Sequence, residues 1–172
     1  MTPLTAEQFL TVDNSLPPPA AAADYQSKLI SLAGSPPKLD LLLLGAGPDG
    51  HTCSLFPNHP LLSEPAPPEG RVVADITDSP KPPPERVTLT LPVRIFYSLF
   101  ATYLMLVSSK VVNSALCCVF AAVGASKAEM VAQLLGEKEP ENQEDLPARM
   151  VKPKNGELYW ILDTSAAKDL SL

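Results

Sequence analysis

The sequence predicts an α/β fold with a mostly parallel sheet, and two observations carry this prediction. Short apolar runs that end at glycine, such as LLLLG at 41–45, are typical of strands covered on both faces of a parallel sheet. Segments with helical features alternate with these runs, which is typical of the α/β class. The 172 residues, of which 45% are hydrophobic and 19% charged, suffice for one domain with a core. We therefore expect residues 1–172 to form a single domain.

The first half of the chain is expected to contain one helix and three strands. A helix that begins with proline is predicted over 19–33, and Gly34 ends it. The apolar run KLDLLLLG at 38–45 predicts a central strand that is fully buried. RVVADI at 71–76 and RVTLTL at 86–91 predict two further strands. The proline-rich stretch between them predicts an irregular loop.

The second half is expected to alternate in the same way. Its predicted order is a strand, a helix, a polar connection, a strand and a short terminal helix, over 118–124, 126–138, 141–156, 157–163 and 164–170. Ser126 is the expected N-cap of the first of these helices, because Glu129 follows it at the spacing of a capping box.

Net charge, cysteine spacing and the N-terminal residues limit which binding partners and which cellular compartment we expect. The formal net charge of -6 leaves no basic face for phosphates, so nucleic acid is not expected as a partner. The three cysteines show no CxxC or Cys/His spacing, so we expect no disulfide framework and no zinc site. No cofactor is expected. The N-terminus lacks a basic region followed by an apolar run, so no signal peptide is expected. These features favour a cytoplasmic protein.

One apolar stretch, RIFYSLFATYLMLVSSK at 94–110, does not follow the alternating pattern. Its 17 residues carry charge only at the two ends. A membrane-spanning helix needs about 20 apolar residues, so attachment to a membrane is not expected. A buried helix is the simpler alternative, and an anomalous insertion is a third.

The turn after the leucine run carries the residues that are most suited to chemistry. Gly45, Gly47 and Gly50 allow backbone N–H groups to approach a ligand closely. Asp49 can orient an imidazole or a water molecule, and His51 can act as a general base near neutral pH. Ligands of open α/β sheets bind beyond the carboxyl ends of the strands, where this turn lies. The alternative is an ordinary glycine-rich turn whose histidine caps the next helix.

A second turn, VGASKAEM at 123–130, follows another predicted strand. Lys127 falls in the first turn of the predicted helix, where its charge opposes the helix dipole. A phosphate bound at the helix N-terminus would account for a lysine at this position. A solvated lysine without a ligand is the simpler alternative.

Together these motifs resemble the 6-phosphogluconolactonases, within the superfamily of glucosamine- and galactosamine-6-phosphate isomerases. The resemblance rests on four stretches, which are LDLLLLGAGPDGHTCSLFPNHPLL (39–62), DSPKPPPERVTLTLPV (78–93), VNSALCCVFAAVGASKAEMV (112–131) and LYWILDTSAA (158–167). The first is the most specific, because GPDGHTCSLFP is the lactonase form of this turn. The resemblance covers nearly all of the chain except 94–110.

The resemblance implies a Rossmann-like parallel sheet sandwiched by helices and a hydrolase that needs no metal. The implied reaction converts 6-phosphoglucono-1,5-lactone to 6-phosphogluconate in the oxidative pentose phosphate pathway. His51 would be the general base that activates water, and Asp49 would hold the imidazole or the water. Lys127 would bind the 6-phosphate, and Arg86 matches a family arginine near the same pocket. Backbone N–H groups around Gly45–Gly50 would stabilise the oxyanion. The expected partner is the sugar phosphate lactone, and the expected state is a monomer.

Two departures from the family pattern open alternatives. A strand–Gly-Gly-Ser–helix turn and an Asp-Glu-Arg segment of the family have no counterpart here, so the chain resembles a family member truncated at its N-terminus, with an incomplete fold. The segment 94–110 interrupts the pattern, and a retained intron or an error in the gene model is our hypothesis for it. The family's Asn-x-Ala-Arg also reads Asn113-Ser114-Ala115-Leu116. An inactive fragment or splice isoform is therefore the main alternative to an active lactonase, ahead of an isomerase or a membrane-attached protein.

Overall fold

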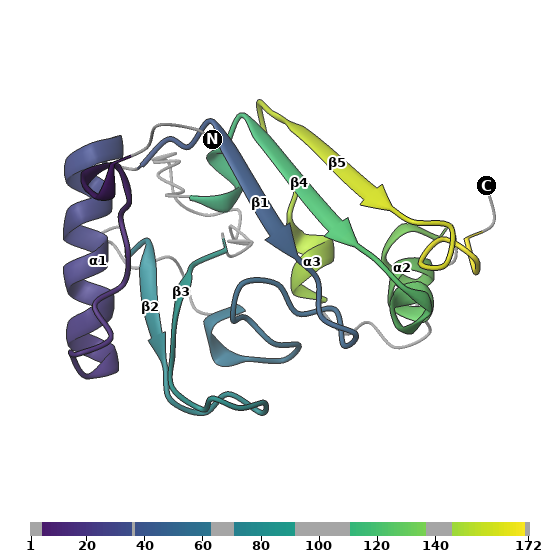
Figure 1. The fold of residues 1–172 in the computed structure, drawn as a ribbon, viewed down its shortest axis with the longest axis horizontal. Coiled ribbons are helices and arrows are strands. Elements are labelled where there is room, and N and C mark those ends of the chain that lie inside the picture. The colour runs from purple at the N-terminus through teal and green to yellow at the C-terminus, as the bar shows by residue number, and fades with distance from the viewer. Residues whose placement is uncertain (1–4, 36, 63–70, 92–110, 137–145, 171–172) are drawn as a thin grey trace, which may run out of the picture.

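The computed structural model describes residues 5–35, 37–62, 71–91, 111–136 and 146–170. Its centre is a parallel sheet of β1 (Leu41–Gly45), β4 (Cys117–Ala122) and β5 (Glu157–Leu162), in the order β1-β4-β5 (Figure 1). Parallel strands require crossover connections, and the helices of an α/β fold lie in such connections. The predicted α/β class with a parallel sheet is thus confirmed.

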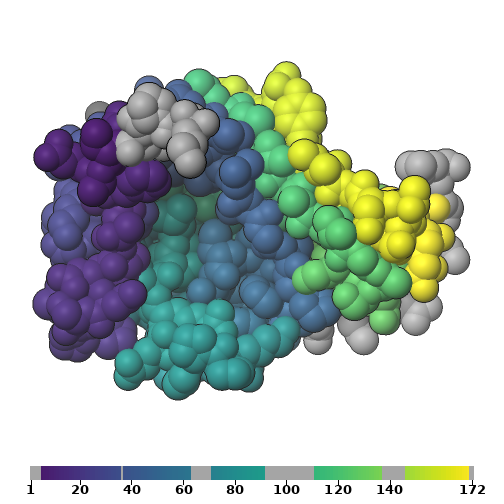
Figure 2. Space-filling model, viewed as in Figure 1, coloured from purple at the N-terminus to yellow at the C-terminus, as the bar shows by residue number. Residues whose placement is uncertain are grey.

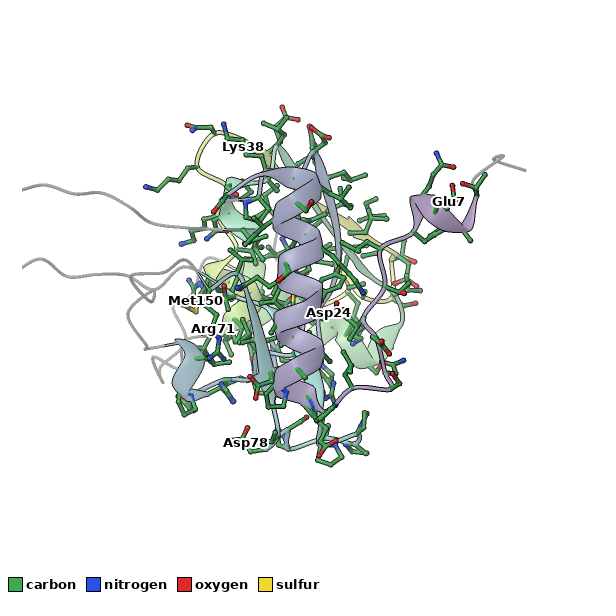
Figure 3. The ribbon with its side chains drawn as sticks, turned by 90° about the vertical axis from the view of Figure 1, so that its left-hand side faces the viewer. Glu7, Asp24, Lys38, Arg71, Asp78 and Met150 are labelled. Carbon is green, nitrogen blue, oxygen red and sulfur yellow. The ribbon has the colours of Figure 1, made fainter. Side chains whose placement is uncertain are left out.

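A smaller unit packs beside this sheet. The strands β2 (Val73–Ile76) and β3 (Arg86–Leu89) pair antiparallel, and the helix α1 (Pro18–Ala33) packs on them. Figure 3 views the molecule from this side and shows α1 in front of the strands, with Asp24 on the helix. Val73, the first residue of β2, and Val72 before it are both buried. Their backbone N–H groups donate to the side chain of Gln26 on α1. The helix therefore fixes the position of the β2–β3 pair.

One face of the parallel sheet is covered by helices. The helices α2 (Ala128–Leu135) and α3 (Pro147–Met150) contribute to the same apolar cluster as the strands. Phe120 of β4 is fully buried there and stacks on the ring of Trp160, with the two ring centroids 4.2 Å apart. Figure 1 shows α3 behind the strands. This covered face holds the main core of the molecule.

The opposite face of the sheet is open, and this differs from the expectation for the leucine run. Exposed and buried residues alternate along β1, whereas a strand covered on both faces would be buried throughout. β1 is also an edge strand of the three-stranded sheet and not a central one. Figure 2 shows segments of all three strands at the molecular surface. The exposed apolar side chains of this open face include Leu41, Leu43, Tyr159 and Ile161.

Three predictions of helical structure were wrong. The helix predicted over 126–138 begins at Ala128 in the structure, because a tight 3-10 turn over Ala125–Lys127 precedes it. Ser126 therefore lies within that turn, and the N-cap of α2 is Lys127, with no side-chain cap. The predicted helix over 164–170 is a series of turns in the structure, although Asp163 Oδ1 accepts the backbone N–H of Ala166 as the N-cap of a helix would.

The remaining differences concern connections. The polar connection over 141–156 contains the short helix α3, which begins at Pro147 as helices often do. The proline-rich stretch between β2 and β3 is irregular, as predicted. The anomalous stretch 94–110 lies outside the described residues. Among the residues that the structure describes, no helix has both the length and the apolar character needed to span a membrane.

Candidate functional site

The site is built on the turn that follows β1. Thr52 is fully buried and donates its hydroxyl to the carbonyl of Gly45, at 2.9 Å, which ties the end of the strand to the returning chain. The N–H of Gly47 donates to the carbonyl of His51, and the N–H of Gly50 donates to the carbonyl of Gly47. Both of these amides are therefore engaged within the turn. They stabilise the loop in this structure and do not point an N–H group toward a ligand.

The structure favours glycine at two of the three glycine positions in this turn, for different reasons. Gly50 adopts a φ of 76°, in the left-handed region that favours glycine. A Cβ at Gly47 would overlap the ring of His51 and crowd the carboxylate of Asp49. At Gly45 a Cβ would meet only open space. Gly47 is thus the position at which the side chains of the site require glycine.

Asp49 and His51 form a direct pair across this turn. His51 Nδ1 lies 2.5 Å from Asp49 Oδ1, and the second carboxylate oxygen, Oδ2, lies 2.7 Å from the ammonium of Lys81. Burial acts to raise the pKa of Asp49, but the hydrogen bonds from Lys81 and His51 outweigh it and lower the pKa to about 2. An ionised carboxylate only accepts hydrogen bonds, so Nδ1 must carry the proton. In the neutral ring, Nε2 is then the nitrogen that can accept a proton.

Phe56 and Arg86 support the pair from one side. The ring of Phe56 lies 4.5 Å from that of His51, centroid to centroid. The guanidinium of Arg86 lies 5.4 Å from the Phe56 ring centroid and donates to the carbonyls of Lys81, Pro82 and Pro83. Arg86 therefore holds the proline-rich loop in place, in addition to any contact with a ligand.

Lys127 joins the second turn to the first. Its ammonium donates to the carbonyl of Ala46 at 2.6 Å, although 81 residues separate the two in the sequence. Gly124 precedes it with a φ of 93°, and the N–H of Lys127 donates to the carbonyl of Gly124. The tight turn after β4 thus points the lysine toward the turn after β1.

These side chains surround a cleft of about 570 Å³ at the carboxyl end of β1. Its lining residues are Leu43, Leu44, Gly45, Ala46, Gly47, Pro48, His51, Cys53, Lys81 and Lys127. Figure 2 shows the three contributing segments side by side, namely the turn after β1, the proline-rich loop and the turn after β4. Of the residues singled out in the sequence, Asp49, Gly50 and Arg86 are not among these lining residues, and Asp49 is joined to the cleft through its contact with His51.

A cysteine nucleophile and a bound metal ion receive less support from the residues around the cleft. Burial raises the pKa of the Cys53 thiol to about 11, so this cysteine is protonated at neutral pH and is a poor nucleophile. Among the described residues, no group of three or more His, Cys, Asp or Glu side chains is arranged to hold a metal ion. The Asp49–His51 pair is the acid–base group that faces the cleft.

Lys81 and Phe56 are site residues that the sequence reading missed. Lys81 lies in a proline-rich segment, and that composition indicates a loop without indicating where the loop packs. Phe56 follows the turn at no spacing that predicts a contact with His51. Only the resemblance to a family, which included both stretches, gave a signal that they belong to one site.

Comparisons with known proteins place this arrangement in context. The sequence model of the family described as glucosamine-6-phosphate isomerases/6-phosphogluconolactonase matches residues 1–95 and 105–160. Over 172 aligned residues, the chain is 45% identical to the 6-phosphogluconolactonase of Rattus norvegicus and 43% identical to that of Homo sapiens. The solved structure of 6-phosphogluconolactonase from Leishmania guyanensis superposes with a TM-score of 0.61 at 28% identity, covering 89% of this chain and 53% of that one.

The lengths in these comparisons differ. The alignments cover 99% of this chain but only 57% of the rat and human proteins. The chain therefore spans little more than half the length of the relatives that it matches.

Proposed function

The chain belongs to the family of glucosamine-6-phosphate isomerases and 6-phosphogluconolactonases, and from this premise we propose that it hydrolyses 6-phosphoglucono-1,5-lactone to 6-phosphogluconate. The observation that carries the proposal is the Asp49–His51 pair, which faces a cleft that also contains Lys127. A base and a cation in the lining of one cleft suit a substrate with a hydrolysable carbonyl and a phosphate. The relatives named as lactonases support the same reaction.

His51 is the proposed general base. Its Nδ1 is paired with Asp49, so Nε2 accepts a proton from water while oxygen of that water bonds to the lactone carbonyl carbon. The carbonyl electrons move to the oxygen and form a tetrahedral oxyanion. When the carbonyl re-forms, the bond to the ring oxygen breaks, and the imidazolium returns its proton to that oxygen. Asp49 stabilises the imidazolium that exists between these two steps.

Lys127 is the proposed ligand of the 6-phosphate. Its ammonium lies in the cleft wall, and its hydrogen bond to Ala46 fixes its direction. An ammonium retains further donors after one hydrogen bond, so the same group can bind a phosphate oxygen. Lys127 also carries one of the charges that favour a dianionic substrate over a neutral sugar lactone. Arg86 contributes less directly in our proposal, because its guanidinium donates to the carbonyls of the proline-rich loop.

The oxyanion needs donors other than the two glycine amides. The N–H groups of Gly47 and Gly50 are engaged within the turn, as described above. The ammonium of Lys81 lies beside Asp49 and is a charged hydrogen-bond donor in the lining of the cleft. We therefore assign oxyanion stabilisation to a side chain or to bound water and not to these two amides.

The test is turnover of freshly prepared lactone by this 172-residue chain. The lactone opens spontaneously, so the rate without protein defines the background. We expect turnover in the native chain and at least a hundredfold loss in His51→Ala, the usual scale for removal of a general base. The matched control is His59→Gln, because His59 pairs with Asp78 at 3.2 Å and does not line the cleft (Figure 3 labels Asp78).

Each outcome of this test has a distinct meaning. Turnover that is lost in His51→Ala and kept in His59→Gln supports the proposed base. Equal turnover in the native chain and in His51→Ala would show that the base lies elsewhere. A folded native chain that never exceeds the background would favour the alternative, an inactive fragment or isoform of the enzyme.

We also propose a cytoplasmic location and a monomeric state. Cys53, Cys117 and Cys118 are all free thiols, which supports a reducing compartment. The open apolar face of the sheet favours association over a monomeric state, since exposed apolar patches often mark interaction surfaces. Sedimentation at several protein concentrations is the measurement that decides the oligomeric state.

A further inference from the structure

Lys81 is a charged residue of the cleft lining whose contact with Asp49 has no part in the reaction proposed above. It lies in the proline-rich loop between β2 and β3, 32 positions beyond its partner Asp49 in the sequence. Its ammonium is 2.7 Å from Asp49 Oδ2, and it also lies 5.9 Å from the centroid of the Phe56 ring. The loop is held in turn by Arg86, which donates to the carbonyl of Lys81. Lys81 is thus fixed by its backbone as well as by its side chain.

The two oxygens of Asp49 have separate partners. Oδ1 pairs with His51 Nδ1, and Oδ2 pairs with Lys81. The carboxylate can rotate about its own axis only if it breaks one of these contacts. Its negative charge is also shared between an ammonium and an imidazole, so less of it acts on the imidazole alone.

The other groups near His51 do not replace Lys81 in this role. On its own turn, Cys53 is protonated at neutral pH and carries no charge. From the turn after β4, Lys127 reaches the cleft but donates to the carbonyl of Ala46. From β3, Arg86 contacts Phe56 and the loop carbonyls. Among the described residues, Lys81 is the cation that directly contacts the carboxylate of Asp49.

We propose that Lys81 is a positioning residue that acts through Asp49: its ammonium holds the carboxylate against His51 Nδ1 and shares its charge, so that Nε2 stays unprotonated and ready to accept a proton. As a statement about catalysis this rests on the proposed function, whereas the effect on the imidazole does not. Without the ammonium, the full carboxylate charge favours the imidazolium. The ring then gains its second proton at a higher pH, and less of the base is available near neutral pH.

The experiment follows the ring nitrogens and carbons of His51 by NMR as the pH is varied, in the full chain. The chain has only two histidines, and His51→Ala assigns the signals. In Lys81→Met we expect the midpoint of the His51 titration to rise by about half a pH unit, the scale of a partly exposed ion pair. Turnover should fall for the same reason, by up to about threefold at pH values below the midpoint, since half a pH unit corresponds to that ratio of unprotonated base. Lys81→Arg keeps the charge, so its His51 titration midpoint and its turnover should stay close to those of the native chain.

The matched control is Lys28→Met. Lys28 also pairs with an aspartate, Asp24, at 2.6 Å, and its side chain is 45% exposed against 40% for Lys81. It lies on α1 and does not line the cleft, so its loss should leave the His51 titration unchanged. An amide spectrum of each variant shows whether the fold is kept.

The possible results separate the two proposals. An unchanged midpoint in folded Lys81→Met, or an equal change in Lys28→Met, would overturn the role of Lys81. Lys81→Arg that behaves like Lys81→Met would also overturn it, since the charge would then be irrelevant. A raised midpoint in a chain without turnover would support Lys81 as the group that positions Asp49 and would count against the proposed hydrolysis alone.

Discussion

Leu43 and Leu44 are neighbours in β1, yet they lie on opposite faces of the sheet. The side chain of Leu44 is 8% exposed and belongs to the main core, together with Phe120 and Met130. Leu43 is 76% exposed. Successive side chains of a strand point to opposite faces, so the same residue type meets a packed core at one position and solvent at the next.

This difference extends across the whole sheet. In register with Leu43 lie Val119 of β4 and Tyr159 of β5, and Gly45, Ala121 and Ile161 form the next row on the same open face. Helices α2 and α3 pack on the other face. The candidate site lies at the carboxyl end of β1, and its lining includes Leu43 and Gly45 of the open face together with Leu44 of the covered face. The site therefore lies where the two faces of the sheet meet.

The largest expected difference separates these two leucines. Leu44→Ala should lower the free energy of unfolding by about 2–5 kcal/mol, because it removes buried methyl groups and leaves a cavity. Leu43→Ala should change it by no more than about 0.5 kcal/mol, as exposed substitutions usually do. The two variants make the same exchange in the same strand, so strand propensity cancels between them. Urea unfolding at one protein concentration measures both.

A large loss in the free energy of unfolding in Leu43→Ala would contradict the expected difference between the two leucines. It would mean that something covers the open face in solution. If its cost grew with protein concentration, the cover would be a second copy of the chain, because association stabilises the folded state by mass action.

The leucine run shows what the sequence can and cannot predict about such a fold. The strand, its end at Gly45 and the parallel pairing were all predicted, because an apolar run before a glycine turn is a local signal. The position of β1 at the edge was not predicted. A run of four leucines looks the same whether or not its second face is covered, and burial depends on elements distant in the sequence.

The second largest difference lies within the turn itself. Gly47→Ala should place a methyl group against the ring of His51 and the carboxylate of Asp49, and so force the pair apart. We expect at least a tenfold loss of turnover, since small displacements of catalytic groups are costly. Unfolding should change little, because the residue lies outside the core cluster. The native chain, assayed at the same protein concentration, is the reference for both measurements.

Comparable turnover in Gly47→Ala and in the native chain would contradict this interpretation of the turn. It would show that the Asp49–His51 pair tolerates displacement or takes no part in the reaction.

The site was predictable in a similar, partial way. Asp49, His51 and the glycines lie within seven residues, so their proximity follows from the turn alone. Lys127 was assigned to the cleft by resemblance, and the structure accounts for its place through the tight turn after Gly124. Lys81 reaches Asp49 because Arg86 holds the proline-rich loop against the turn. Such tertiary contacts leave no periodic signal in the sequence.

The smallest expected difference concerns acid stability. Asp49 has a pKa of about 2 in the folded chain, below the ordinary value of 3.8. The ionised group therefore contributes stability that is fully present above about pH 4 and is lost as the pH falls through 2. Asp49→Asn removes this contribution, so the free energies of unfolding of the native chain and the variant should converge between pH 5 and pH 2. Because the side chain of Asp49 is 33% exposed, solvent screens its pairs, and we expect convergence by no more than about 1 kcal/mol. Urea unfolding at closely spaced pH values measures it, and two curves that stay parallel down to pH 2 would show that the pairs with His51 and Lys81 do not stabilise the ionised carboxylate.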